Sequence, residues 1–212
     1  MGHKVNPIGF RIPLAPNDSW RSRWFATRSV KYSTYLGEDV KLRKALMARL
    51  APAGVVRIDI ERGTDNVYKI FLKVARPGLV IGRGGKGIEE VSKAIRERLE
   101  ALMRKRKTNR AKVSISLTVD ELKRSEISAQ YLAQSIAWDL EKRMRARRTI
   151  KKYLELIMSN RDAQGAKIKL SGRLDGNEIS RREQLSAGKL PLQTLRANID
   201  YGEATAFNTY GT

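Results

Sequence analysis

Apolar residues recur along this chain at two spacings, and these spacings predict helices and strands. Residues 38–50 keep the three-to-four-residue spacing of a helix, and a second helical stripe runs from Ile88 to Leu102. Residues 56–60, 70–74 and 113–119 alternate apolar with polar side chains, which is the period of a strand. Two successive helices with a glycine-rich loop between them separate the last two strands, so the predicted order is αββααβ.

The second half of the chain has the same mixed character. A helix capped by Ser125 or a neighbour is predicted to bury a stripe from Ala129 to Leu140, and another stripe runs from Ile150 to Met158. The later predicted elements are a strand over 167–170, a turn over 171–173, a short helical piece over 178–185 and a strand over 194–201. The predicted fold class is therefore α+β in both halves.

The glycine-rich stretch combines two features that suit an anionic ligand. Residues 82–87 read Gly-Arg-Gly-Gly-Lys-Gly, and glycines without a Cβ let the backbone lie close against another chain. The helix predicted to begin near Lys86 turns its free N–H groups and the positive end of its dipole toward the loop. Arg83 and Lys86 add full charges, so the stretch predicts a cradle for phosphate groups.

Two familiar phosphate-binding loops do not fit the flanking residues. A nucleoside-triphosphate P-loop requires Ser or Thr after its lysine, but Lys86 is followed by Gly87, and Val80 stands where the first glycine belongs. A dinucleotide fingerprint G-x-G-x-x-G is formally present, but Arg76-Pro77-Gly78 interrupts the approach to it. The acid that should follow about 20 residues later is missing, because residues 105–107 are Lys-Arg-Lys.

A third loop fits, that of the K-homology (KH) domain, which clamps the backbone of about four nucleotides. Residues 81–88 resemble its I-G-x-x-G-x-x-I signature at every defined position. Together with the order αββααβ, they resemble a type II KH domain, which implies a three-stranded sheet with the helices on one face. A surface turn without a ligand is the alternative, and it leaves the flanking apolar pairs and cations unexplained.

The expected RNA-binding residues of the loop are Gly82, Arg83, Gly84, Gly85 and Lys86. Gly84 stands where KH loops more often carry a basic residue, so we expect less contact energy there.

The charge of the chain indicates a polyanionic partner. Its 212 residues include 43 Lys and Arg against 22 Asp and Glu, a net charge of +21, which makes nucleic acid the first expectation. An anionic membrane is a weaker alternative, because the apolar runs are short and no basic helix has an insertion face rich in large apolar residues. There is no cysteine, and the single histidine, His3, has no second ligand nearby, so we expect no metal and no other cofactor.

Cations also concentrate in two segments outside the loop. In residues 1–36 they alternate with aromatic residues, which can stack on bases while the cations pair with phosphates. Alternatively, Trp20, Trp24 and Phe25 pin this arm to the domain core, and the sequence leaves both readings open. Residues 141–152 carry seven cations and one acid, more than a solvated helix face requires, which predicts contact with phosphates.

Longer runs resemble one family, the bacterial-type ribosomal small-subunit protein three of the subunit head. The similar runs follow one another in order over nearly the full length: residues 2–11, 75–82, 135–137, 147–151, 165–169, 171–174 and 191–201. A KH signature alone would indicate only a fold, whereas this set indicates the family.

The resemblance implies a structural, non-enzymatic ribosomal protein in the cytoplasm. It implies binding to small-subunit rRNA in the head, contact with small-subunit proteins ten and fourteen, no membrane and no homo-oligomer. It also implies a place lining the channel through which mRNA enters, where the protein holds incoming mRNA and helps to unwind it by phosphate contacts. In the family, basic residues on the helix after the KH domain face the mRNA, and the matching positions are Arg147, Arg148 and Lys151. Further candidate RNA contacts are Lys4, Arg11, Arg21, Arg23, Arg143, Arg145, Lys152 and Arg173.

The expected domains are a basic and aromatic arm over 1–36, a type II KH domain over 37–120 and a C-terminal α+β domain over 121–212. Two other functions account for parts of the sequence. A free KH regulator or assembly factor would read single-stranded RNA, but the long basic arm and the full-length resemblance speak against it. A lyase acting on damaged nucleic acid would need a lysine with a lowered pKa in a pocket, and the sequence singles none out.

Overall fold

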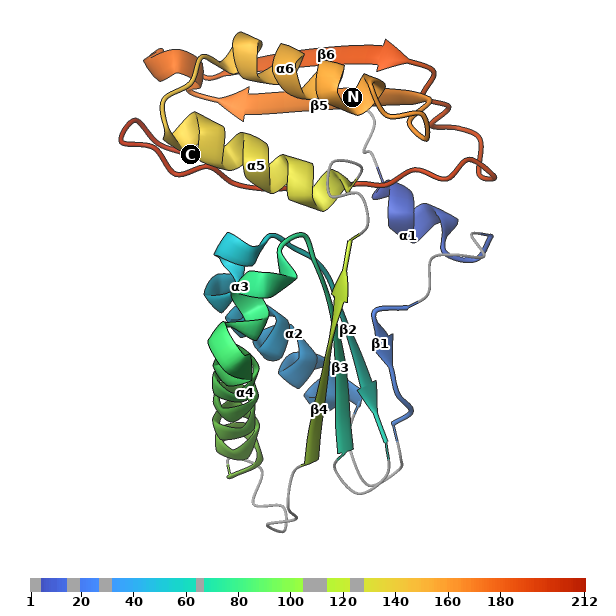
Figure 1. Ribbon diagram of the computed structural model, residues 1–212. Helices are drawn as coiled ribbons and strands as arrows, with labels where there is room; N and C mark the ends of the chain where they lie inside the picture. The colour runs from blue at the N-terminus through green and yellow to red at the C-terminus, as the bar shows by residue number, and fades with distance from the viewer. Residues whose placement is uncertain (1–4, 15–19, 27–31, 64–66, 105–113, 123–127) are drawn as a thin grey trace. The chain divides into compact units, whose positions relative to one another are not determined.

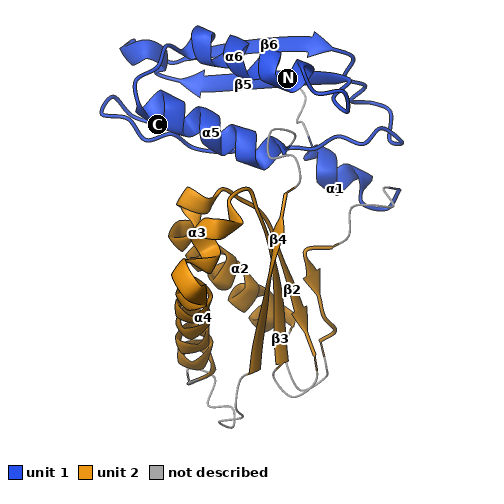
Figure 2. Ribbon diagram, viewed as in Figure 1, with its two compact units in different colours: residues 1–19, 124–212 blue, residues 20–123 orange. Residues whose placement is uncertain are grey.

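The chain folds into two compact units, shown in a computed structural model that describes residues 5–14, 20–26, 32–63, 67–104, 114–122 and 128–212. One unit comprises Trp20–Lys123, and the other joins Met1–Ser19 to Arg124–Thr212 (Figure 2). The start of the chain therefore belongs with its second half.

The unit Trp20–Lys123 is a sheet with helices on one face. Its strands are β1 (Ser22–Arg23), β2 (Val55–Arg62), β3 (Val67–Val74) and β4 (Ser114–Glu121), in the spatial order β1-β2-β3-β4. Its helices are α2 (Tyr32–Arg49), α3 (Pro77–Ile81) and α4 (Lys86–Arg104), with 3-10 turns at η1 (Ala51–Ala53) and η2 (Arg83–Gly85). The central strands β2 and β3 are antiparallel, and β3 and β4 are parallel (Figure 1). The predicted order αββααβ is confirmed.

One apolar core holds this unit together. Ile60 and Ile70 face each other across β2 and β3, and both are fully buried. Leu46 from α2 and Leu99 from α4 close over them, so both helices cover the same face of the sheet (Figure 1). The clean alternation in β3, where every second residue is buried, matches the period expected of a half-covered strand.

The sheet has a fourth strand that the sequence did not predict. β1 has only two residues and pairs parallel to the end of β2, with Ser22 opposite Ile60. A strand of two residues is too short to show an alternation of apolar and polar side chains, so its position is set by tertiary contacts. Trp24 Nε1 and Ser22 Oγ each donate a hydrogen bond of 2.8 Å to Asp39 Oδ2 on α2. These bonds fasten β1 and the residue after it to α2.

A buried arginine completes this attachment. Arg62 donates hydrogen bonds to Glu38, at 2.9 Å, and to Asp39, and its side chain is only 6% exposed. Its guanidinium also lies 4.5 Å from the ring centre of Tyr35 and 5.7 Å from that of Trp24. Trp24 is therefore pinned to the core, as one of the two interpretations held, but Trp20 and Phe25, which were expected to do the same, are 68% and 89% exposed.

The second unit is a hairpin covered by two helices. Its elements are α1 (Pro7–Arg11), α5 (Ala129–Glu141), α6 (Ala146–Met158), β5 (Gly165–Gly172), η4 (Leu174–Gly176) and β6 (Arg181–Gly188). Ile168 on β5 pairs with Leu185 on β6, and both pack against Ile136 and Ile150 of the helices. Ser128 caps α5 and accepts a hydrogen bond from the Tyr131 N–H, so a neighbour of Ser125 is the cap.

Two predicted elements of this unit are wrong, and the turn predicted over 171–173 begins too early, because Ser171 and Gly172 still belong to β5. Residues 178–185 were expected to include a helical piece, but 181–188 form β6, because Leu185 and Ala187 alternate inward and pair with β5. Residues 194–201 were expected to form a strand, but they have no regular structure. Both outcomes depend on contacts with other elements, because β6 pairs with β5 and Asp200 bonds to the beginning of α5.

The segment after β6 runs along α5 instead of joining the sheet (Figure 1). Asp200 Oδ2 accepts a 2.7 Å hydrogen bond from the Ala129 N–H at the beginning of α5, and Glu141 at its end accepts from the Phe207 N–H at 3.1 Å. A Cβ on Gly202 would lie 2.4 Å from the backbone of Ala129. Only glycine permits so close an approach.

Arg11 joins the beginning of the chain to this same segment. It is 3% exposed, and its guanidinium donates to the carbonyls of Pro7 at 3.2 Å, Pro191 at 3.5 Å, Leu192 at 2.7 Å and Thr194 at 3.2 Å. A cation with four carbonyl partners inside the unit has a structural role here.

Candidate RNA-binding surfaces

The glycine loop lies between α3 and α4, as its KH signature predicted. Gly82, Gly84 and Gly85 all have positive φ, at 69°, 63° and 81°, a region that other residues rarely adopt. These turns allow α3 to end and α4 to begin within four residues. Gly82, Arg83, Gly84 and Lys86 are exposed, and Gly85 is half-buried. The loop backbone is therefore accessible to a ligand.

Gly87 has a role that the sequence analysis missed. A Cβ at this position would lie 2.4 Å from the carbonyl oxygen of Val80, which is closer than any real contact. Gly87 thus lets the first turn of α4 pack against the end of α3, and the presence of a fourth glycine in the run is the signal that could have shown this.

The electrostatics of the loop favour an anion, although modestly. The 19-residue helix α4 turns its N-terminus to the loop, and Arg83 and Lys86 make no ion pair or side-chain hydrogen bond with the described residues. Glu89 in the first turn of α4 offsets part of this charge. The loop therefore offers an anion mainly its backbone donors.

A second surface follows the outer face of α6. Arg147, Arg148, Lys151, Lys152 and Glu155 line a shallow depression of about 490 Å³. Residues three and four apart lie on the same side of a helix, so the spacing of these residues brings them together. The three positions expected to contact mRNA do share one face.

Two of these cations have partners and two do not. Arg147 Nε lies 3.1 Å from Glu183 Oε1 on β6, and Lys152 Nζ lies 3.2 Å from Asp139 Oδ2 on α5. Arg148 and Lys151 make no ion pair with the described part of the chain. Arg147 still has a side chain 80% exposed, so its charge also remains accessible.

Tyr153 fixes α6 against α5. Its hydroxyl donates a 3.0 Å hydrogen bond to Asp139 Oδ2, the same oxygen that Lys152 approaches. Burial, and then this hydrogen bond to a carboxylate, raises the pKa of Tyr153 to about 12. Tyr153 therefore stays protonated at neutral pH and holds the basic face in place.

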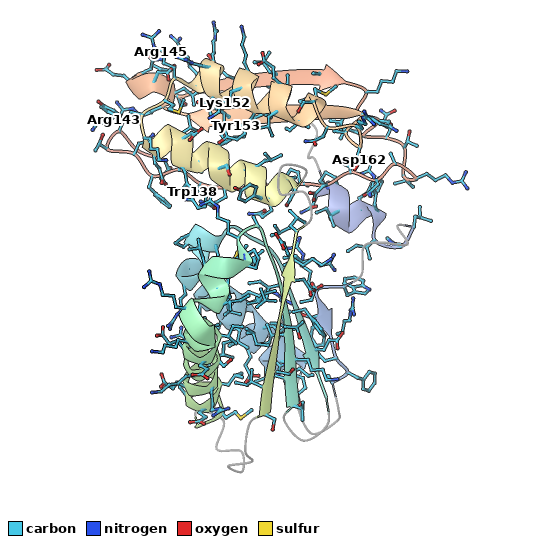
Figure 3. The ribbon with its side chains drawn as sticks, viewed as in Figure 1. Trp138, Arg143, Arg145, Lys152, Tyr153 and Asp162 are labelled. Atoms are coloured by element: carbon cyan, nitrogen blue, oxygen red, sulfur yellow. The ribbon has the colours of Figure 1, made fainter. Side chains whose placement is uncertain are left out.

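The turn between α5 and α6 carries further cations. Arg143 has a positive φ of 62°, and Arg145 precedes the first residue of α6; both side chains are exposed (Figure 3). Arg145 gives α6 no side-chain cap, so Asp175 of η4 accepts the Ala146 N–H at 2.9 Å instead. Asp175 acts from 29 residues away, and sequence reasoning could not have found it.

The remaining candidates divide by exposure. Arg21 is exposed, and Arg23 pairs with Glu61 at 2.9 Å. Arg173 donates to the carbonyls of Asn177 and Tyr210, both at 2.9 Å, and Arg11 is buried as described above. The structure thus gives Arg11, Arg23 and Arg173 partners within the protein. Lys4 and His3 lie outside the described residues.

Within the described ranges, no three His, Cys, Asp or Glu side chains form a group that could hold a metal ion. The same part of the chain contains no helix that is both long and apolar enough to cross a membrane.

Comparison with known proteins agrees with both halves of this structure. Residues 41–127 match the KH domain family, and residues 136–212 match the family "Ribosomal protein S3, C-terminal domain". The chain is 43% identical over 211 residues to the small ribosomal subunit protein uS3 of Desulfitobacterium hafniense, covering 100% of this chain and 88% of that protein. The uS3 proteins of Nitrosomonas eutropha and Clostridioides difficile are also 43% identical over 211 residues, covering 100% of this chain and 90% and 72% of those proteins. Full-length identity at this level, joined to a KH unit with its glycine loop, shows that the chain belongs to the small ribosomal subunit protein uS3 family.

Proposed function

We propose that the outer face of α6 holds incoming mRNA by its phosphates at the channel through which mRNA enters the small subunit, and so helps to unwind it. As a member of its family, the chain is a structural, non-enzymatic constituent of the small ribosomal subunit that binds rRNA, and in bacteria it acts in the cytoplasm. The particular surface and the mRNA are our proposal.

The observation that carries the proposal is the pair Arg148 and Lys151. They lie about one turn apart on the exposed face of α6, beside the exposed Arg147, and have no acidic partner among the described residues. Charges that the protein itself leaves unpaired can bind phosphates without first breaking an internal ion pair.

The mechanism is electrostatic. Arginine presents a planar fork of donors that matches two phosphate oxygens, and lysine contributes a compact charge on a flexible stem. Phosphate contacts carry no sequence information, which suits a surface that must accept any mRNA. Holding each strand after thermal opening biases the duplex toward separation without nucleotide hydrolysis by this protein.

The glycine loop has a separate part in the proposal. Gly82, Arg83, Gly84, Gly85 and Lys86 would grip an RNA backbone through main-chain N–H groups and the N-terminus of α4. Since Gly84 adds no charge and Glu89 is nearby, we expect this contact to be weaker than that of α6.

The experiment is ribosomal unwinding of a downstream mRNA duplex by subunits carrying Arg147→Ala, Arg148→Ala and Lys151→Ala together. We expect slower unwinding on normally assembled subunits. The matched control changes Lys93, Arg96 and Arg98 of α4 to Ala, which removes the same charge from a helix that also carries glutamates. Unwinding equal to that of the control would overturn the proposal.

Binding of the free protein to single-stranded RNA gives a second readout. Each phosphate neutralised contributes about 0.7 to the slope of log affinity against log salt, so loss of three contacts should reduce the slope by about 2. An unchanged slope would argue that these residues touch no phosphate.

The neighbouring proteins ten and fourteen of the subunit head also belong to the proposal. Cross-linking from intact subunits, followed by identification of the attached proteins, tests these contacts. Co-sedimentation with small subunits through high salt separates a ribosomal constituent from a free KH regulator, which would be released.

A further inference from the structure

We propose that the open face of the β5–β6 hairpin is a second RNA-binding surface, which holds an rRNA backbone on the side of the unit opposite to α6. This inference deepens the proposed function by separating the surface that anchors the protein from the surface that handles mRNA.

The register of the hairpin sorts its side chains onto two faces. Ile168 and Leu185 point to the core under α5 and α6, together with the half-buried Leu170. Lys167, Lys169 and Ser171 of β5 alternate with them and are exposed. Their partners across the hairpin are Ser186, Gln184 and Arg182, which are exposed as well. This second face is therefore entirely polar.

The charge of this face is of one sign. Its ionisable residues are Lys167, Lys169 and Arg182, and the one acid in either strand, Glu183, points to the other face and pairs with Arg147. None of the three cations makes an ion pair or side-chain hydrogen bond with the described residues. They differ in this from Arg11 and Arg173, whose donors reach carbonyls of the protein.

The cations are close enough to act together. Residues two apart on a strand are about 6.7 Å apart, and diagonal neighbours on paired strands are about 7–8 Å apart. Lys169 lies two residues from Lys167 on β5. It is also a diagonal neighbour of Arg182, because Gln184, the direct partner of Lys169, lies two residues from Arg182 on β6. Like charges at this spacing repel one another, and a row of phosphates removes the repulsion. Ser171, Gln184 and Ser186 add groups that can bond to phosphate and ribose oxygens.

The geometry favours rRNA over mRNA as the occupant. α6 packs on the inner face of the hairpin through Ile150 and Tyr153, so its basic outer face and the open face of the sheet point away from each other. One strand of mRNA lying on α6 does not reach the open face. A flat, rigid face with fixed cations suits a stationary backbone.

The test uses complete small subunits that contain Lys167→Gln, Lys169→Gln and Arg182→Gln together, washed at increasing salt. We expect this variant to leave the subunit at lower salt than wild type, with unwinding per retained protein unchanged. In the free protein, the salt slope for binding an rRNA fragment should fall by about 2. The α4 variant of Lys93, Arg96 and Arg98 is the charge-matched control and should be retained like wild type.

A second variant distinguishes lost charge from lost structure. Lys167→Arg, Lys169→Arg and Arg182→Lys keep the charge and should restore retention. Retention of the glutamine variant at wild-type salt, equal release of the charge-preserving variant or equal release of the α4 control would each overturn the proposal. Slower unwinding with normal retention would also overturn it, by assigning the face to mRNA. If the α6 experiment alone fails, the proposal for the hairpin face is still tested by retention, because the α6 experiment measures unwinding.

Discussion

The two units of this protein are stabilised in different ways. In the unit Trp20–Lys123, strands and helices enclose a continuous core in which Ile60, Ile70 and Leu72 are fully buried. The other unit has a smaller core, and side chains bonded to distant backbone groups connect its parts, as Arg11 and Asp175 do. Apolar patterning therefore explains most of the first unit, whereas the second depends on single polar contacts.

This contrast predicts that the first unit suffers most from lost apolar volume. Leu72→Ala should destabilise it by about 2–5 kcal/mol, because a fully buried leucine leaves a cavity that the sheet cannot close. Hydrogen exchange resolved along the chain should show faster exchange in β2, β3 and β4 and little change in α5 and α6. Leu79→Ala, at a position 59% exposed, is the control. Equal loss of protection in both units would contradict the division.

The second unit should be sensitive to a single polar contact. Asp175→Ala removes the only side-chain cap that the described residues give α6 and should cost about 0.5–2 kcal/mol. Faster exchange is expected in the first turn of α6, where the basic face begins. Asp175→Asn keeps an acceptor oxygen and should retain most of the stability. Normal protection of α6 in the alanine variant would show that the cap contributes little.

A smaller effect is expected from Tyr153→Phe, which removes the hydrogen bond to Asp139 at a cost of about 1 kcal/mol at neutral pH. Because the pKa of Tyr153 in the folded protein is about 12, against an ordinary value of 10.0, the unfolded chain loses this proton first. The stabilisation should thus be complete below pH 10 and be lost as the pH rises toward 12. Denaturant unfolding of both proteins over this range measures the difference, which should shrink; a constant difference would contradict the assignment.

The same division explains what the sequence could predict. The alternation in β3 and the glycine signature are local, so the order αββααβ and the position of the loop were predicted correctly. The residues of β6 and 194–201 have weak local patterns, and their structure depends on β5 and α5. The pairing of Arg11 with Thr194 joins residues 183 positions apart, which no local period reveals.

The candidate sites divide in the same manner. The family resemblance singled out Arg147, Arg148 and Lys151, and the structure shows that the three line one depression on α6. Which cations of this depression are paired depends on residues of other elements, because Arg147 pairs with Glu183 of β6 and Lys152 pairs with Asp139 of α5. Arg11 and Arg173 look like surface cations in the sequence, and only the fold shows that their donors are engaged within the protein.

In the proposed function, the outer face of α6 lies against mRNA in the assembled subunit. A photo-reactive residue in place of Glu155, which lines the same depression without belonging to the cations, tests it directly. We predict cross-links to mRNA downstream of the decoding site, with none from the same group placed at Glu97 on α4. Cross-links from position 155 to rRNA alone would contradict the proposal that this face of α6 holds mRNA.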